Sequence, residues 1–228
     1  MKRYDRGFTL IEIAIVLVII GLLLGGVLKG QELITGARVR NLISQQDGIK
    51  AAFFGFQDRY RALPGDYASA STNINCGTGS CANGNGNGRI ESISVTPAPP
   101  EAEDVLAWNH LTAAGFMNGN YTYTPGATAP SDANNPKNPY SSYLQLVYDG
   151  VYGAGGSPAK HNVKTGTQVP VEIIAEVDRK IDDGLPYAGA FQFSTYNGAA
   201  TACLTGTAPN VTWNIKGGET NCGGASLI

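Results

Sequence analysis

The first strong pattern along the chain is an unbroken run of apolar residues near its amino end. From Phe8 to Leu28 the only polar side chains belong to Thr9 and Glu12. A run of about 20 apolar residues is long enough to cross the hydrocarbon core of a membrane as a helix. The pattern therefore predicts a membrane-spanning helix at residues 8–28.

A short charged leader, residues 1–7, precedes this span. Its charged residues are Lys2, Arg3, Asp5 and Arg6. Because basic residues beside a span favour the cytoplasmic side, the rest of the chain is expected on the far side of the membrane. Lys29 follows the span directly. An ordinary secretory signal is not indicated, because its apolar region would end in small residues at a cleavage site.

Glu12 is the one charged side chain within the predicted span. A carboxylate there costs about 2.5 to 3.5 kcal/mol on insertion scales and normally has a partner. One reading keeps the carboxylate hydrated near the membrane interface. In the other, cleavage after Gly7 exposes an α-amino group on Phe8, four residues away. The two groups can then pair within one helix or between parallel helices staggered by about a turn.

The hexapeptide from Gly7 to Glu12, GFTLIE, resembles the prepilin signature of type IV pilins and of the pseudopilins of type II secretion systems. The close match covers roughly residues 1–35. The resemblance implies that a prepilin peptidase cuts after Gly7 and that the new amino terminus, Phe8, is methylated. It also implies that Glu12 pairs with the amino terminus of a neighbouring subunit during filament assembly.

The resemblance further implies a structural subunit of a pilus-like filament. Such a subunit is anchored in the inner membrane with its globular domain in the periplasm before assembly. It is then assembled into a periplasmic pseudopilus or a cell-surface pilus. Its partners are the prepilin peptidase and other pilin or pseudopilin subunits. The alternative is a surface binding or adhesion module that uses the pilin route for export. That reading places a ligand site in the Asn- and Tyr-rich stretch at residues 118–142.

An amphipathic pattern continues the helix through residues 29–63. The apolar positions of one helical face, spaced by seven, four, three and four residues, are Leu42, Ile49, Phe53, Phe56 and Tyr60. This face is expected to cover the core of an exported domain, residues 64–228. No proline occurs between Phe8 and Leu63, and Pro64 followed by Gly65 supplies the stop.

After Leu63 the chain becomes rich in Gly, Ser, Thr, Asn and Pro. Helical spacing of apolar residues predicts short helices at 101–115 and 171–183, and alternation predicts strands near 143–147, 190–196 and 211–215. The expected fold class is α+β. A long amino-terminal helix would pack against a small antiparallel sheet, as in pilins.

The four cysteines occur as two local pairs along the chain. Disulfides suit an exported domain, and the favoured connectivity of the three available joins Cys76 to Cys81 and Cys203 to Cys222. The second bridge would contribute about 3 kcal/mol by closing a carboxyl-terminal loop. Zinc is the less favoured reading, because neither spacing is a short ligand pair and the two histidines are isolated.

An alternation of asparagine and glycine follows the first cysteine pair. The candidate calcium ligands are Asn83, Asn85, Asn87, the backbone carbonyl of Arg89, and Glu91. Oxygen ligands at alternate positions with glycines between them match the first half of a calcium loop. The competing reading is a glycine-asparagine turn held by the Cys76–Cys81 bridge. Three acids at 178, 182 and 183 leave a similar choice between a second cation site and a solvated helix end.

The net charge and the motifs of the sequence argue against two classes of function, nucleic-acid binding and enzymatic catalysis. The formal net charge is −2, and removal of residues 1–7, with three basic and one acidic residue, lowers it to −4. This balance gives no electrostatic case for nucleic-acid binding. The sequence has no serine elbow, no paired histidine ligands and no phosphate-binding glycine loop, so an enzyme is not predicted.

Overall fold

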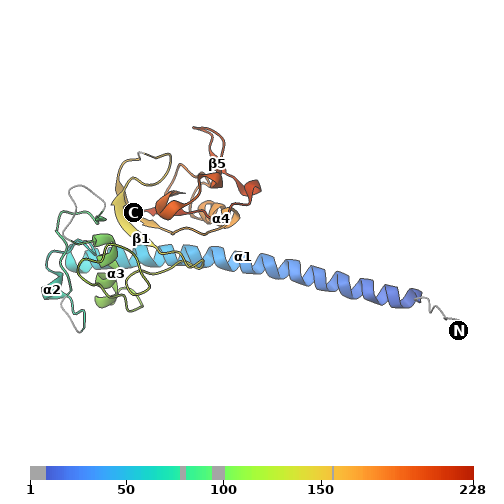
Figure 1. The fold of residues 1–228 in the computed structure, drawn as a ribbon, viewed down its shortest axis with the longest axis horizontal. Helices are drawn as coiled ribbons and strands as arrows, with labels where there is room; N and C mark the ends of the chain where they lie inside the picture. Colours follow the sequence, from blue (N-terminus) through green and yellow to red (C-terminus); the bar gives the residue numbers. More distant parts are fainter. Residues whose placement is uncertain (1–8, 78–80, 94–100, 156) are drawn as a thin grey trace, which may run out of the picture. The chain divides into compact units, whose positions relative to one another are not determined.

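The computed structural model describes residues 9–77, 81–93, 101–155 and 157–228 (Figure 1). Gly7 and Phe8, the expected processing residues, lie outside the described residues. The chain divides into two compact units, one ending at Arg38 and one running from Val39 to Ile228. Each unit is described by itself below.

The first unit is the amino-terminal part of helix α1, whose bounds are Leu10–Tyr60. Every side chain from Leu10 to Leu28 is exposed to solvent in the structure. The helix is long and apolar enough to cross a membrane by length and composition. A Cβ added at Gly21, Gly25 or Gly26 would meet nothing within 4 Å. This unit therefore fits a membrane anchor, as the apolar run indicated.

The second unit contains the rest of α1, which has one buried face. The predicted positions Leu42, Ile49, Phe53 and Phe56 are all buried there. The helix ends at Tyr60, three residues before the expected limit of 63. Arg61 adopts a positive φ of 52°, so the backbone leaves the helix before Pro64 enforces a stop.

A four-stranded antiparallel sheet forms the centre of this unit, with the order β1-β2-β6-β3. Its strands are β1 (Gln145–Asp149), β2 (Lys160–Lys164), β6 (Gly224–Leu227) and β3 (Phe191–Phe193). A separate two-stranded sheet pairs β4 (Leu204–Thr205) with β5 (Thr212–Trp213). The helices are α2 (Ala70–Asn73), α3 (Glu103–Ala113) and α4 (Val171–Ile181), and the 3-10 turns are η1 (Tyr196–Gly198), η2 (Thr201–Cys203) and η3 (Ile215–Gly217).

Two hydrophobic clusters hold the second unit together, and α1 contributes to both. In the first, Phe53 and Phe56 pack with Trp108 of α3 and with β1 and β2 residues. In the second, Val39 and Leu42 pack with α4, β3 and Trp213. The sheet thus rests on α1, with α3 and α4 completing the two clusters (Figure 1). The expected α+β, pilin-like layout is confirmed.

The two inner strands, β2 and β6, were not predicted. Lys164 of β2 is 1% exposed, and its Nζ donates to Asp149 and to Gln145 Oε1. Gln145 Nε2 in turn donates to the buried Asp104 of α3 at 2.7 Å. Burial lowers the pKa of the Lys164 ammonium, against the opposing charge of Asp149. A buried polar network therefore lies on one face of β1 and β2.

Candidate functional site

The amino end of α1 is closed by a reciprocal pair of hydrogen bonds. Glu12 Oε2 accepts from the backbone N–H of Thr9 at 2.7 Å and from the Thr9 hydroxyl at 2.8 Å. The backbone N–H of Glu12 donates back to Thr9 Oγ1 at 3.3 Å. This is a capping box, in which two of the unpaired N–H groups at a helix start are satisfied. Glu12 thus has a partner inside its own helix.

The capping box places the Glu12 carboxylate beside the expected cleavage point. It binds the N–H of Thr9, the residue that follows Phe8. The positive end of the helix dipole also lies there and favours a carboxylate. Sequence reasoning missed the role of Thr9, although the spacing Thr-x-x-Glu is a known signal for this cap.

Comparison with family models bears on this amino end. Residues 2–28 match the model described as the prokaryotic N-terminal methylation motif. The chain carries a prepilin-type signal. This is the signature of type IV pilins and pseudopilins, and it indicates a structural, pilin-like protein. No curated protein and no solved structure gave a significant match to the chain.

Beyond the prepilin-type signal, the asparagine-glycine loop is the next candidate. The side-chain oxygens of its asparagines each accept a backbone N–H. The pairs are Asn83 with Ser71, Asn85 with Asn87, and Asn87 with Arg89, at 2.8, 2.9 and 2.9 Å. The amide nitrogens of Asn85 and Asn87 donate to Glu91 Oε2 at 3.4 and 2.8 Å. The structure brings Glu91 together with two of the three asparagines and satisfies the loop internally.

Two buried carboxylates hold this loop in place. Asp66 accepts from the N–H groups of Asn87 and Gly88, each at 2.9 Å. Glu103 accepts from those of Asn85 and Glu91 at 2.9 and 3.0 Å. This role of Asp66 was not predicted from the sequence. The signal available was its place directly after the Pro64-Gly65 helix stop, which returns the chain toward α3.

The carboxylates around this loop disfavour one another's ionised forms. Burial raises the pKa of Glu103 to about 7, and the carboxylates of Asp66 and Glu91 add to the rise, against two backbone hydrogen bonds. Burial likewise raises the pKa of Asp66. Because the ionised form of Glu103 is disfavoured in the fold, its contribution to stability is present at acidic pH and is lost as pH rises through about 7. Calcium binding at this loop stays a prediction.

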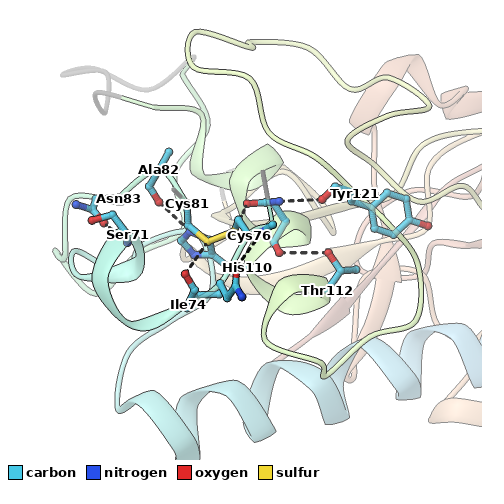
Figure 2. The surroundings of a disulfide bond; sticks show 12 residues. Ser71, Ile74, Cys76, Cys81, Ala82, Asn83, His110, Thr112 and Tyr121 are labelled. Atoms are coloured by element: carbon cyan, nitrogen blue, oxygen red, sulfur yellow. Dashed lines mark hydrogen bonds between the residues drawn. A yellow bond between two sulfur atoms is a disulfide. The ribbon is translucent and has the colours of Figure 1, made fainter. Parts of the chain in front are cut away.

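Both cysteine pairs are bridged, Cys76 to Cys81 and Cys203 to Cys222. Figure 2 shows His110 of α3 next to the first bridge. Its Nδ1 accepts from the N–H of Gly65 at 3.0 Å, and its Nε2 lies 2.9 Å from the Ala82 carbonyl oxygen. Burial lowers the pKa of this imidazole to about 4. His110 is therefore a neutral structural link between the helix stop, the bridge and the loop, and not a metal ligand.

Two backbone segments approach each other so closely at Gly84 that a side chain there would clash with the other segment. A Cβ on this residue would lie 2.2 Å from the carbonyl oxygen of Gly65. We expect Gly84→Ala to lower the free energy of unfolding by about 2 kcal/mol, the usual range for forced overpacking. The matched control is Gly48→Ala, where nothing lies within 4 Å and the helix should gain up to about 1 kcal/mol. Chemical denaturation of both variants measures this, and equal stability would contradict the close approach.

The Asn- and Tyr-rich stretch at 118–142 is mostly exposed, with a few side chains held by internal contacts. Asn134 and Asn135 are buried, and their amide nitrogens donate to the carbonyls of Ala129 and Leu144. The hydroxyl of Tyr123 donates to Glu101 at 2.5 Å. These three side chains are held within the loop, and the ligand site expected at residues 118–142 stays a prediction.

Proposed function

We propose that the protein is a structural subunit of a pilus-like filament, either a type II secretion pseudopilin or a type IV pilin. A prepilin peptidase cuts the chain after Gly7, and Phe8 is then N-methylated. The observation that carries this proposal is the methylation motif at residues 2–28, with Glu12 held at the start of α1. The exposed apolar face of Leu10–Leu28 is the surface that such subunits bury in the membrane and then in the filament.

Cleavage changes the electrostatics of the capping box. Once residues 1–7 are gone, Phe8 carries a positive amino group next to Thr9, whose N–H already binds the Glu12 carboxylate. A carboxylate and an ammonium group in a low-dielectric environment attract strongly, provided that both find partners. In a filament, the amino group of one subunit would then form an ion pair with the Glu12 carboxylate of its neighbour. Such contacts are heterologous and repeat without closing.

The experiment that tests this is intact mass measurement with amino-terminal fragmentation. The protein is recovered separately from sheared surface material and from the cell envelope. A chain beginning with methylated Phe8 in the sheared fraction supports a surface pilus subunit. The same mature chain confined to the envelope supports a pseudopilin. An uncut leader in both fractions would overturn the proposed processing.

A further inference from the structure

An amine and a primary amide lie side by side in the interior of the globular unit. Gln145 of β1 and Lys164 of β2 are opposite each other in the antiparallel register, and both are buried. Residues opposite each other in such a pair have Cβ atoms about 5 Å apart, so their side chains can touch. The fold therefore brings a nucleophile to an acyl group in a place with little water.

The side-chain amide of Gln145 is held at both ends. Its Oε1 accepts from Lys164 Nζ at 3.1 Å, and its Nε2 donates to Asp104 Oδ2 at 2.7 Å. The amide carbon is one bond from Oε1, so Nζ lies within about 4.3 Å of that carbon. Acyl transfer needs a nucleophile near the carbonyl carbon and an acid within hydrogen-bond reach of the leaving nitrogen. Lys164 and Asp104 occupy these two places.

Asp149 lies on the other side of the amine. Its carboxylate forms an ion pair with Lys164 Nζ, and its side chain is 21% exposed. Asp149 Oδ1 accepts from Asn162 Nδ2 and from the N–H of Val151, both at 3.1 Å. Asp149 therefore keeps the amine beside Gln145, can accept a proton from it, and connects the buried network with solvent.

Burial favours the neutral forms of the groups on both sides of the amide. It raises the pKa of the Asp104 carboxyl, against the hydrogen bond from Gln145 and the charge of Lys164. It lowers the pKa of the Lys164 ammonium, against the charge of Asp149. A neutral carboxyl group can donate a proton, and a neutral amine is the nucleophilic form of lysine.

A simple ion pair does not account for the whole network. Lys164 and Asp149 would neutralise each other without Gln145, and Lys164 reaches Asp104 only through its charge. Asp104 is nevertheless buried against the nitrogen of the Gln145 amide. The order of the four side chains, Asp149, Lys164, Gln145 and Asp104, is the order of base, nucleophile, acyl group and acid.

We propose that Lys164 and Gln145 form an isopeptide bond that joins β2 to β1 covalently. Nζ attacks Cδ of Gln145, so the Nζ–Cδ bond forms and the Cδ–Nε2 bond breaks. Two protons leave Nζ: Asp149 takes one, and the other replaces the proton that Asp104 gives to the departing nitrogen. One molecule of ammonia is released and no co-reactant is consumed.

The bond depends on the folded state of the globular unit. It closes the segment 145–164 into a covalent ring, and the two side chains meet only after β1 and β2 have paired. Holding the groups in contact replaces a bimolecular encounter, which is how a slow reaction between an amine and an amide can proceed in a fold. Neither leader cleavage nor filament assembly is required.

The test is mass spectrometry of the full-length chain, purified in detergent, then denatured, reduced and alkylated. The bond lowers the mass by that of ammonia, about 17 Da. Asn-Gly steps such as Asn83-Gly84 lose the same mass when they form a succinimide, so the loss must be located by digestion. Trypsin should release residues 138–160 joined to residues 161–179, with two amino termini and no cut after Lys164.

The other outcomes of this measurement overturn the proposal. Full mass, with trypsin cutting after Lys164, shows a free amine and no bond. The same two segments joined with the loss of water, about 18 Da, would place the bond at the carboxyl group of Asp149 and remove Gln145 from the reaction. Fragment ions of the joined peptide distinguish Gln145 from Asp149. No variant is needed for this part of the test.

Three variants assign the roles. Asp104→Asn keeps an oxygen acceptor for the Gln145 amide but has no acidic proton, so the rate of bond formation should fall by roughly 100-fold or more. Lys164→Met should abolish the joined peptide. Lys160→Arg is the matched control, because residue 160 lies at the exposed end of the same strand and arginine preserves the trypsin site. This control should form the bond fully, and a wild-type rate in Asp104→Asn would overturn the role of Asp104 as the acid.

Discussion

Replacing Glu12 with leucine should leave the leader cleaved but keep the subunit out of filaments. Leucine removes the carboxylate that binds Thr9 and that would take the amino group of a neighbouring Phe8. It also makes insertion of the span into the membrane more favourable by about 2.5 to 3.5 kcal/mol. The cost of leaving the membrane rises by the same amount. A difference of about 3 kcal/mol at each subunit step is roughly a hundredfold in occupancy. The incorporated fraction, measured in sheared or cross-linked filaments, should fall to background.

Glu12→Gln separates the two roles of this side chain. Glutamine at this position preserves a capping box but carries no charge. If pairing with the neighbouring amino group drives assembly, this variant should fail as Glu12→Leu does. Glu32→Gln is the control, because Glu32 is exposed, lies further along α1 and pairs only with Lys29 among the described residues. Normal filaments from Glu12→Gln would reduce the role of Glu12 to capping its own helix.

Replacing Gly7 with alanine should block maturation and leave the full-length chain in the membrane. In the proposed processing the cleaved bond lies between Gly7 and Phe8, and a residue without a side chain at that point lets a peptidase approach the backbone closely. Without cleavage no positive amino group forms beside Thr9, so assembly should stop as well. Intact mass will show the retained leader, residues 1–7.

Gly21→Ala is the matched control for this change. It makes the same substitution in α1, at a position where an added Cβ meets nothing within 4 Å. This variant should be processed normally and should remain in the membrane. A mature chain beginning at Phe8 from Gly7→Ala would contradict the assigned cleavage point.

The amino-terminal part of the molecule was predictable because a single physical requirement dominates it. A span must be apolar and helical, and the amphipathic stretch after it must present one face to a core, so periodicity alone located Leu42, Ile49, Phe53 and Phe56. The positions of the cysteines along the chain also predicted how they pair, because cysteines close in sequence form disulfides that close short loops. The Thr9 cap was predictable from its spacing to Glu12, because Thr-x-x-Glu is the pattern of a capping box.

The inner strands were hidden because their residues do not have strand-like patterns. β2 reads Lys-His-Asn-Val-Lys, and its last lysine is buried only because Asp149 and Gln145 neutralise and bind it. β6 begins with Gly224, which the ring of Phe191 approaches so closely that a Cβ would lie 2.3 Å from it. Tertiary contacts decide both strands, and no local window of sequence contains those contacts. The roles of Asp66 and His110 were hidden in the same way.

The position of β6 has a consequence for how the globular unit is made. The strand, Gly224–Leu227, follows β1, β2 and β3 in the sequence, yet it lies between β2 and β3 and pairs with both. Ile228 itself donates to the carbonyl of His161. The sheet therefore cannot close until residues 224–227 have been synthesised and translocated. A chain that lacks residues 224–227 would have no strand between β2 and β3, so the two halves of the sheet would stay unjoined and the globular unit would not fold.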